Sequence, residues 1–126
     1  MINQIGKITL YVKDQAEAKK FWTEKAGFTV KLEQPMGPGM TWLEVGPSKE
    51  SFTTFVLYSK EVMAMQNPKT NLGHPSVLLS TSDIDETYSN FKSNGIDVGA
   101  LMNMPYGRMF TFKDQDGNDF IVREDK

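Results

Sequence analysis

The sequence predicts an α+β fold in which two tandem β–α–β–β–β modules form curved mixed sheets around a cup. Three observations support this prediction. Residues 8–30 and 77–98 repeat the same order of apolar and polar residues at an offset of 69. Each copy carries an acidic residue where a helix would begin and a glycine where it would end. After each helix come short alternating stretches separated by turn residues, which is typical of strands joined by hairpins.

The first copy begins with a strand over residues 5–12, in which apolar and polar side chains alternate. Asp14 and Glu17 then form a variant of the capping box, and Gly27 ends the helix that they start. The inward stripe of this helix is expected to comprise Ala18, Phe21, Trp22 and either Lys25 or Ala26. Three strands are expected to follow at residues 28–33, 42–46 and 52–58, with a turn at 36–40.

The second copy follows a polar linker, residues 59–73, which has room for a short helix around residues 61–66. Asp83 and Glu86 start the helix of this copy. Gly95 ends it and aligns with the glycine of the first copy after the loss of one residue. The inward residues of this helix are expected to be Ile84, Thr87, Tyr88 and Phe91. Strands are expected at 76–81, 97–101, 108–113 and 118–124, with turns at 104–107 and 114–117.

Each copy is about 60 residues long, which is too short to bury much surface by itself. The sequence therefore predicts one domain, residues 1–126, made of two repeats at about 1–58 and 74–126. The junction between duplicated halves is a natural place for a ligand.

Composition excludes several functional classes. The formal net charge of −2 gives no global field that would attract nucleic acid or an anionic membrane. No apolar stretch approaches the ~20 residues that span a bilayer, and the N-terminus lacks the pattern of a signal peptide. The absence of cysteine excludes disulfides and thiolate metal sites, and it fits a reducing compartment. The expectation is a cytoplasmic protein with neither a nucleic-acid nor a membrane partner.

The paired modules, with a V-x-D helix start and a D-x-D-G-N closing turn, resemble the vicinal oxygen chelate superfamily, which includes glyoxalase I, bleomycin-resistance proteins and extradiol dioxygenases. The most specific segments are ITLYVKDQAEAKKFWTEKAGF, PMGPGMTWLEVGP and MPYGRMFTFKDQDGNDF. They are most similar to small single-domain, glyoxalase-like bacterial members. The resemblance implies the glyoxalase/bleomycin-resistance fold. It also implies a homodimer whose cups are lined by residues of both chains or of both halves.

The resemblance further implies four His or Glu metal ligands in metal-dependent members, one on the first and one on the last strand of each copy. The matching positions here are Lys7, Phe55 (or Leu57 after a shift of two), Ser76 and Ile121. A protonated lysine repels a cation, and phenylalanine and isoleucine have no lone pair to offer. No divalent metal and no other cofactor is therefore expected.

His74 is the only histidine and lies two residues before Ser76, on the same face of the predicted strand. One interpretation is a partly exposed histidine at a loop-to-strand junction. The alternative is a register slip of two that would place His74 in the metal column. A lone histidine does not build a catalytic metal site.

Alternation of side chains assigns further residues to the cup. Trp42 is expected either to line the pocket or to fill the core. Its repeat mate Arg108 would bind a carboxylate or phosphate, or pair with Glu44. Tyr106, on the preceding turn, would close over a ligand or face solvent. The complete set of candidate ligand-binding residues is Lys7, Tyr11, Trp42, Glu44, Phe55, Ser76, Tyr106, Arg108, Phe110 and Ile121.

Three functions remain open from the sequence. The first is metal-independent binding of a small aromatic or antibiotic-like molecule in an apolar cup. The second is a metal-dependent lyase or isomerase of the glyoxalase type, or an extradiol dioxygenase, which the superfamily favours and the missing ligands oppose. The third is a metal-free acid–base enzyme that uses Lys7 as its catalytic base.

Overall fold

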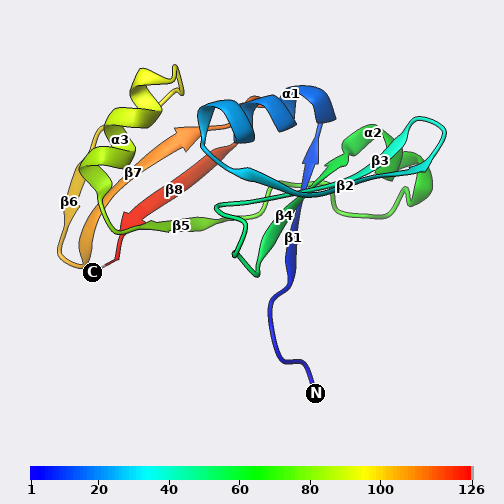
Figure 1. Ribbon diagram of the computed structural model, residues 1–126, viewed down its shortest axis with the longest axis horizontal. Coiled ribbons are helices and arrows are strands. Elements are labelled where there is room, and N and C mark those ends of the chain that lie inside the picture. The colour runs from blue at the N-terminus through cyan, green and yellow to red at the C-terminus, as the bar shows by residue number, and fades with distance from the viewer. Residues whose placement is uncertain (126) are drawn as a thin grey trace. The chain divides into compact units, whose positions relative to one another are not determined.

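The computed structural model describes residues 1–125 and forms two compact units, the first ending at His74 and the second beginning at Pro75. Each unit is a four-stranded sheet that carries a helix (Figure 1). The predicted α+β class with two β–α–β–β–β modules is confirmed. That the two repeats join into one domain stays a prediction. Within residues 1–125, no helix combines the length and apolarity needed to cross a membrane.

The sheet of the first unit contains four strands in the order β1-β4-β3-β2. Their bounds are β1 (Lys7–Val12), β2 (Thr29–Gly37), β3 (Met40–Gly46) and β4 (Thr54–Ser59). β1 pairs with β4 in parallel, whereas the β2–β3 and β3–β4 pairs are antiparallel. The mixed pattern follows because a helix carries the chain from β1 across the sheet, while short turns join the later strands.

The helix between β1 and β2 is α-helical over α1 (Gln15–Lys20) and π-helical over η1 (Phe21–Lys25). The Asp14 carboxylate accepts backbone N–H groups from Ala16 and Glu17, as a helix cap requires. In the π-helical part the Ala26 N–H donates to the carbonyl of Phe21, five residues earlier. This segment was expected to be an ordinary α-helix. The π-turn accommodates the one residue by which the helical region from Asp14 to Gly27 is longer than its equivalent from Asp83 to Gly95.

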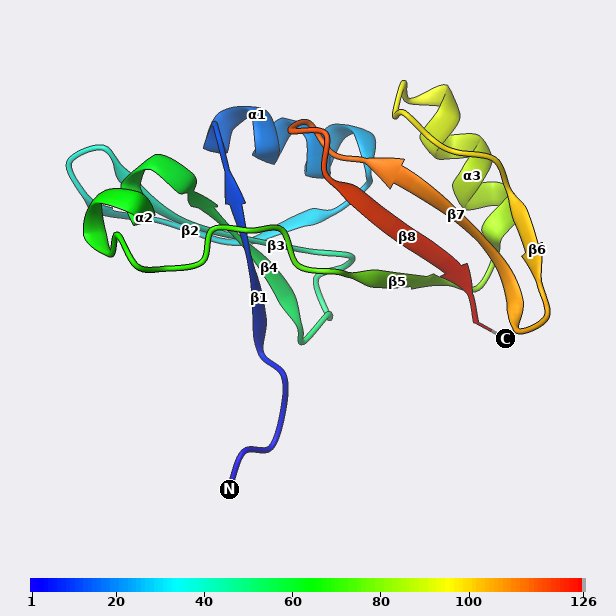
Figure 2. The same ribbon diagram turned by 180° about the vertical axis from the view of Figure 1, so that it is seen from behind.

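The core of the first unit lies between this helix and the sheet. Trp22 is 0% exposed and lies with its ring centroid 5.2 Å from Phe55 and 4.8 Å from Phe28. Its position on the helix agrees with the predicted inward stripe. A further short helix, α2 (Lys60–Gln66), follows β4 in the linker (Figure 2).

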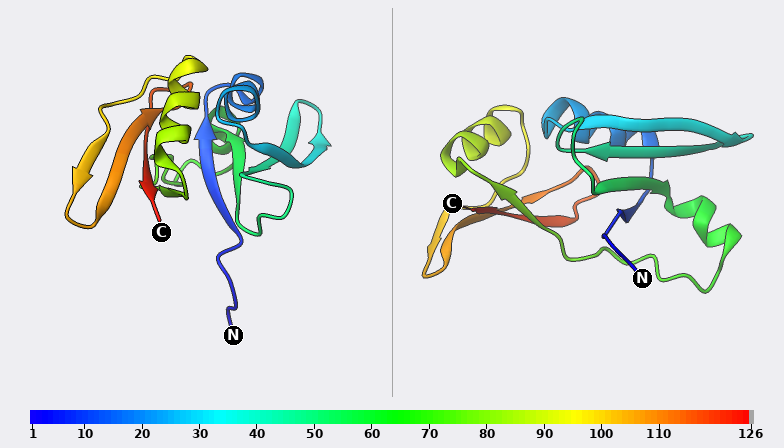
Figure 3. Two further views of the ribbon diagram at one scale, coloured as in Figure 1. Left: turned by 60° about the vertical axis from the view of Figure 1, so that its left-hand side comes forward. Right: turned by 60° about the horizontal axis from the view of Figure 1, so that its bottom comes forward.

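The second unit repeats the plan with strand order β5-β8-β7-β6. Its elements are β5 (Leu78–Thr81), α3 (Ile84–Ser93), β6 (Met102–Met104), β7 (Gly107–Lys113) and β8 (Asp119–Glu124). In both views of Figure 3, α3 lies against one face of this sheet. Asp83 caps α3 by accepting the Glu86 N–H. Asp114 holds the tight turn before β8 by accepting the N–H groups of Asp116 and Asn118.

One strand of the second unit was predicted in the wrong place. Residues 97–101 form only an isolated bridge between Val98 and Phe112, and the strand lies at β6 instead. The Gly99 N–H still donates to the Thr111 carbonyl, and a Cβ at Gly99 would lie 2.8 Å from Oγ1 of Thr111. The backbone therefore lies so close to Thr111 at this point that a side chain at position 99 would require Thr111 to move. β5, the first strand of the second unit, also begins at Leu78, two residues later than predicted.

Candidate functional site

Each sheet has one face against its helix and one face turned away, which we call the far face. In the first unit the ring contacts of Phe55 with Trp22 and Phe28 place the odd-numbered residues of β4 against the helix. Residues paired across neighbouring strands point to the same face, so the pairing of β4 with β1 and β3 also assigns the alternating residues of those two strands to a face. The first far face comprises Lys7, Thr9, Tyr11, Trp42, Glu44, Thr54, Val56 and Tyr58.

The assignment of Phe55 to the cup is wrong, and Leu57, the alternative, faces the helix as well. Thr9 pairs with Val56 in the first sheet, and its repeat mate Leu78 pairs with Ile121 in the second. Val56, not Phe55, is therefore the equivalent of Ile121. Aligning the copies one residue out of register moved the side chain to the opposite face.

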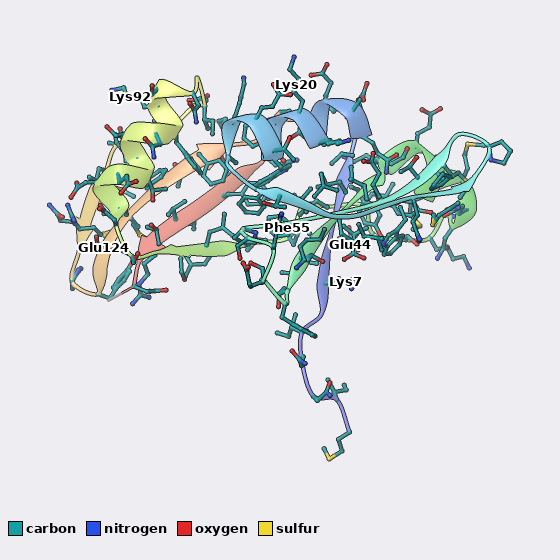
Figure 4. All side chains as sticks on the ribbon, in the orientation of Figure 1. Lys7, Lys20, Glu44, Phe55, Lys92 and Glu124 are labelled. Carbon is teal, nitrogen blue, oxygen red and sulfur yellow. The ribbon has the colours of Figure 1, made fainter. Side chains whose placement is uncertain are left out.

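Glu44 is the polar centre of the first far face (Figure 4). The residue is 6% exposed, and its carboxylate accepts hydrogen bonds from Trp42 Nε1 at 2.7 Å and Thr54 Oγ1 at 3.1 Å. The Lys7 ammonium lies 3.6 Å from Oε1 of Glu44. The three donors come from three different strands, so the paired strands hold the carboxylate in place.

The surroundings of Glu44 favour its charged form. Burial opposes ionisation, but the hydrogen bonds from Trp42 and Thr54 and the positive charge of Lys7 outweigh that effect. Together they hold the pKa of Glu44 below its ordinary value. The first far face therefore contains a buried carboxylate that is ionised and neutralised by a neighbouring lysine.

Three aromatic rings lie beside this polar centre. The ring of Tyr58 makes edge contacts with Tyr11 at 6.4 Å and with Trp42 at 6.3 Å between centroids. Tyr58 is buried and donates its hydroxyl hydrogen to Oε1 of Gln66 on α2 at 2.6 Å. Tyr11 and Trp42 are only half-buried. Sequence reasoning missed Tyr58 and Thr54, which the parallel register with Tyr11 and Lys7 would have identified.

Two residues assigned to the cup of the second unit face its helix instead. Phe110 is 0% exposed and contacts the rings of Tyr88 and Phe91 on α3 at 5.0 and 6.0 Å. Arg108 has the same parity on β7 and forms two hydrogen bonds with Asp85 of α3 at 3.1 and 3.0 Å. The same offset error explains both mistakes. Because Thr111 is the second-copy equivalent of Glu44, the equivalent of Trp42 is Met109 and not Arg108, one residue earlier.

Arg108, on β7, forms structural ion pairs near the start of α3. Besides Asp85 it contacts the carboxylate of Glu124, which Figure 4 labels, at 3.3 Å, and Glu124 also accepts the Ile84 N–H. Hydrogen bonds with Asp85, followed by those with Glu124, raise the pKa of Arg108 above its ordinary value. The predicted pairing of Arg108 with Glu44 is replaced by these two partners.

The second far face differs in chemistry from the first. Its residues are Leu78, Ser80, Met102, Met104, Met109, Thr111, Ile121 and Arg123. Tyr106, on the turn between β6 and β7, is 57% exposed and lies under the Arg123 guanidinium at 5.6 Å. His74 and Ser76 precede β5 and are exposed.

The residues at the four positions that hold metal ligands in metal-dependent relatives do not fit a divalent ion. With the corrected register they are Lys7, Val56, Ser76 and Ile121. A cationic amine, two hydrocarbons and one hydroxyl supply no imidazole or carboxylate donor. Across residues 1–125, no group of three or more His, Asp or Glu side chains is arranged to hold a metal.

Comparison with known proteins places the chain in a family. Residues 4–122 match the Glyoxalase/Bleomycin resistance protein/Dioxygenase superfamily. The chain therefore belongs to that superfamily. It is 42% identical to the protein YetH of Bacillus subtilis (strain 168) over 125 residues, which cover 98% of this chain and 100% of YetH.

Two solved structures from Streptomyces sp. CB03234 are also similar. TnmS3, described as an antibiotic binding protein, aligns with a TM-score of 0.82 at 31% identity, covering 99% of this chain and 98% of TnmS3. A glyoxalase/bleomycin resistance protein from the same strain aligns with a TM-score of 0.72 at 32% identity, covering 93% and 96% of the two chains.

Proposed function

We propose that this protein binds a planar aromatic or antibiotic-like small molecule on the first far face without using a metal ion. The observation that carries the proposal is the arrangement of Tyr11 and Trp42. Both rings are half-buried and both pack on Tyr58, and Trp42 donates a hydrogen bond to the carboxylate that Lys7 neutralises. Rings fixed in this way offer an apolar surface to a flat ligand at little cost in conformational entropy.

The comparisons support binding rather than metal catalysis. TnmS3, at 31% identity, is described as a protein that binds an antibiotic. The glyoxalase-type or dioxygenase alternative requires metal donors, and the residues at Lys7, Val56, Ser76 and Ile121 do not provide them.

The proposal is tested by titration calorimetry with a panel of fused-ring aromatic compounds. We expect saturable binding by the wild-type protein and a loss of about tenfold or more in affinity in Trp42→Ala, since stacking on one ring is worth about 1–3 kcal/mol. Phe52→Ala is the matched control because Phe52 is aromatic, 60% exposed and absent from the first far face. Failure of the wild-type protein to bind any member of the panel would contradict the proposal.

A further inference from the structure

Of the three residues that donate to Glu44, which are Lys7, Trp42 and Thr54, Lys7 makes the longest contact. Each oxygen of the Glu44 carboxylate already accepts a shorter hydrogen bond from a neutral donor, Trp42 Nε1 on one side and Thr54 Oγ1 on the other. The Lys7 contact, at 3.6 Å, is longer than a normal hydrogen bond. The carboxylate therefore keeps a donor on each oxygen when the ammonium turns towards another acceptor.

The position of Lys7 also suits a ligand that lies on the aromatic rings. Its side chain is 48% exposed, whereas that of Glu44 is 8% exposed. Trp42 lies on the same face, and it contacts the same carboxylate as Lys7: Trp42 Nε1 is 2.7 Å from one oxygen of Glu44 and the Lys7 ammonium is 3.6 Å from the other. The edge of a fused-ring molecule stacked on Trp42 can therefore reach the ammonium.

The charge around Lys7 favours an acceptor. An ammonium offers three donors and no acceptor, and Glu44 takes at most one of them at long range. The nearby carboxylate limits the desolvation cost of covering the ammonium, because the pair as a whole is neutral. A purely hydrocarbon ligand that covered Lys7 would instead leave its remaining donors without partners, which is costly.

We propose that the ligand of the first far face carries an acceptor oxygen, as a carboxylate or a carbonyl, on the edge of its ring system, and that Lys7 donates to this oxygen. This inference rests on the proposed function and specifies the class of ligand. It assigns Lys7 a role in ligand selection.

Three probes that share one ring system test whether binding depends on an acceptor oxygen. They are naphthalene-2-carboxylate, 2-acetylnaphthalene and 2-methylnaphthalene, measured by calorimetry. We expect the two oxygen-bearing probes to bind the wild-type protein more tightly than 2-methylnaphthalene. Lys7→Met keeps the length of the side chain without its charge and should weaken the oxygen-bearing probes by about tenfold, as expected for a hydrogen bond to a charged group. The affinity for 2-methylnaphthalene should not fall.

Two further variants make the result decisive. Lys7→Arg retains a cationic donor and should keep most of the preference for oxygen, which also guards against a folding defect specific to methionine. Lys20→Met removes an exposed lysine of α1 and should bind all three probes as the wild type does. Equal binding of the three probes by the wild type, or an equal change for all three in Lys7→Met, would overturn this inference alone. Binding of none of them would contradict the proposed function together with it.

Discussion

Glu44 combines two properties that are rarely found together, burial and a negative charge. It is 6% exposed, yet donors from β1, β3 and β4 surround it and hold its pKa below the ordinary value. A buried carboxylate without such partners would favour its protonated form. The stability of the first unit is therefore linked to the charge of this one side chain.

Replacing Glu44 with glutamine tests that link through the pH dependence of stability. The pKa of Glu44 is lower in the folded chain, so its contribution is present above the unfolded value of about 4.3 and disappears as the pH falls through the folded value. The wild-type protein should therefore lose stability on acidification more steeply than Glu44→Gln. At neutral pH the variant should be about 1–3 kcal/mol less stable, because a buried charge-assisted interaction is lost.

Urea unfolding at several pH values between about 7 and 3 measures both effects. Glu50→Gln is the matched control because Glu50 is an exposed carboxylate of the same unit, and it should follow the wild-type curve. Parallel curves for Glu44→Gln and the wild type would show that Glu44 carries no pH-dependent stability.

At the scale of the strands, successive side chains point to opposite faces of the sheet, so odd-numbered and even-numbered residues of one strand have different surroundings. β7 alternates between Phe110 and Phe112, which contact α3, and Met109 and Thr111, which face away. The two sets of side chains differ in their surroundings although they are adjacent along the chain. Substitutions at neighbouring positions should therefore have very different costs.

Phe110→Ala and Met109→Ala form a matched pair that tests which residues of β7 face α3 and which face away. Phe110 is 0% exposed among aromatic rings, so its truncation should cost about 3–5 kcal/mol in the free energy of unfolding. Met109 is half-buried on the far face, and its truncation should cost about 1 kcal/mol. Denaturant unfolding of both variants measures the difference, and equal costs would mean that the face assignment of β7 is incorrect.

The element types could be predicted from the sequence, whereas the faces of β4 and β7 could not. Asp14, Asp83 and the glycines that end the helices are local signals, and the helices begin and end where these residues predict. The placement of Phe55, Arg108 and Phe110 depended on aligning the two copies across turns of unequal length. Loop length varies at little energetic cost, but a slip of one residue in a strand inverts every side chain.

The π-helical segment η1 offers a direct test of the extra residue in the first copy. Deletion of Glu24, which is exposed, should convert the bond from Ala26 to Phe21 into an ordinary α-helical bond and leave the chain folded. Deletion of exposed Ser89 in α3 is the control. It should rotate the following residues by about 100° and remove Phe91 from the core.

Circular dichroism and thermal unfolding compare the two deletions. The Glu24 deletion should retain a cooperative transition, and the Ser89 deletion should lose it or shift it far lower. A Glu24 deletion as damaging as the Ser89 deletion would show that the π-turn is required for packing and does not simply accommodate an extra residue.

At the scale of the whole molecule, the edges of the sheets point to self-association. β2 and β6 are edge strands, and they carry exposed apolar side chains. These are Leu32 and Met36 on β2, and Met102 and Met104 on β6. Unpaired edges with apolar side chains favour pairing with another chain. A homodimer is therefore expected, and it remains a prediction.

Light scattering coupled to size exclusion should return about twice the chain mass of 14.2 kDa at micromolar concentration. Met36→Lys and Met104→Lys place a charge on one edge each, and the variant that returns to the mass of a single chain identifies the edge in contact. A wild-type mass of a single chain would rule out a stable dimer.

Because side chains alternate along the six residues of β1, residues that stabilise the fold and residues that face a ligand lie next to one another in the sequence. Leu10 and Val12 are buried against the helix and maintain the fold, while Lys7 and Tyr11 face the opposite way and maintain the chemistry of the far face. A mutation in one set leaves the other set in place. Descendants of one ancestor can therefore keep a common interior while they diverge in the molecules they recognise, and a duplicated chain can explore two such surfaces at once.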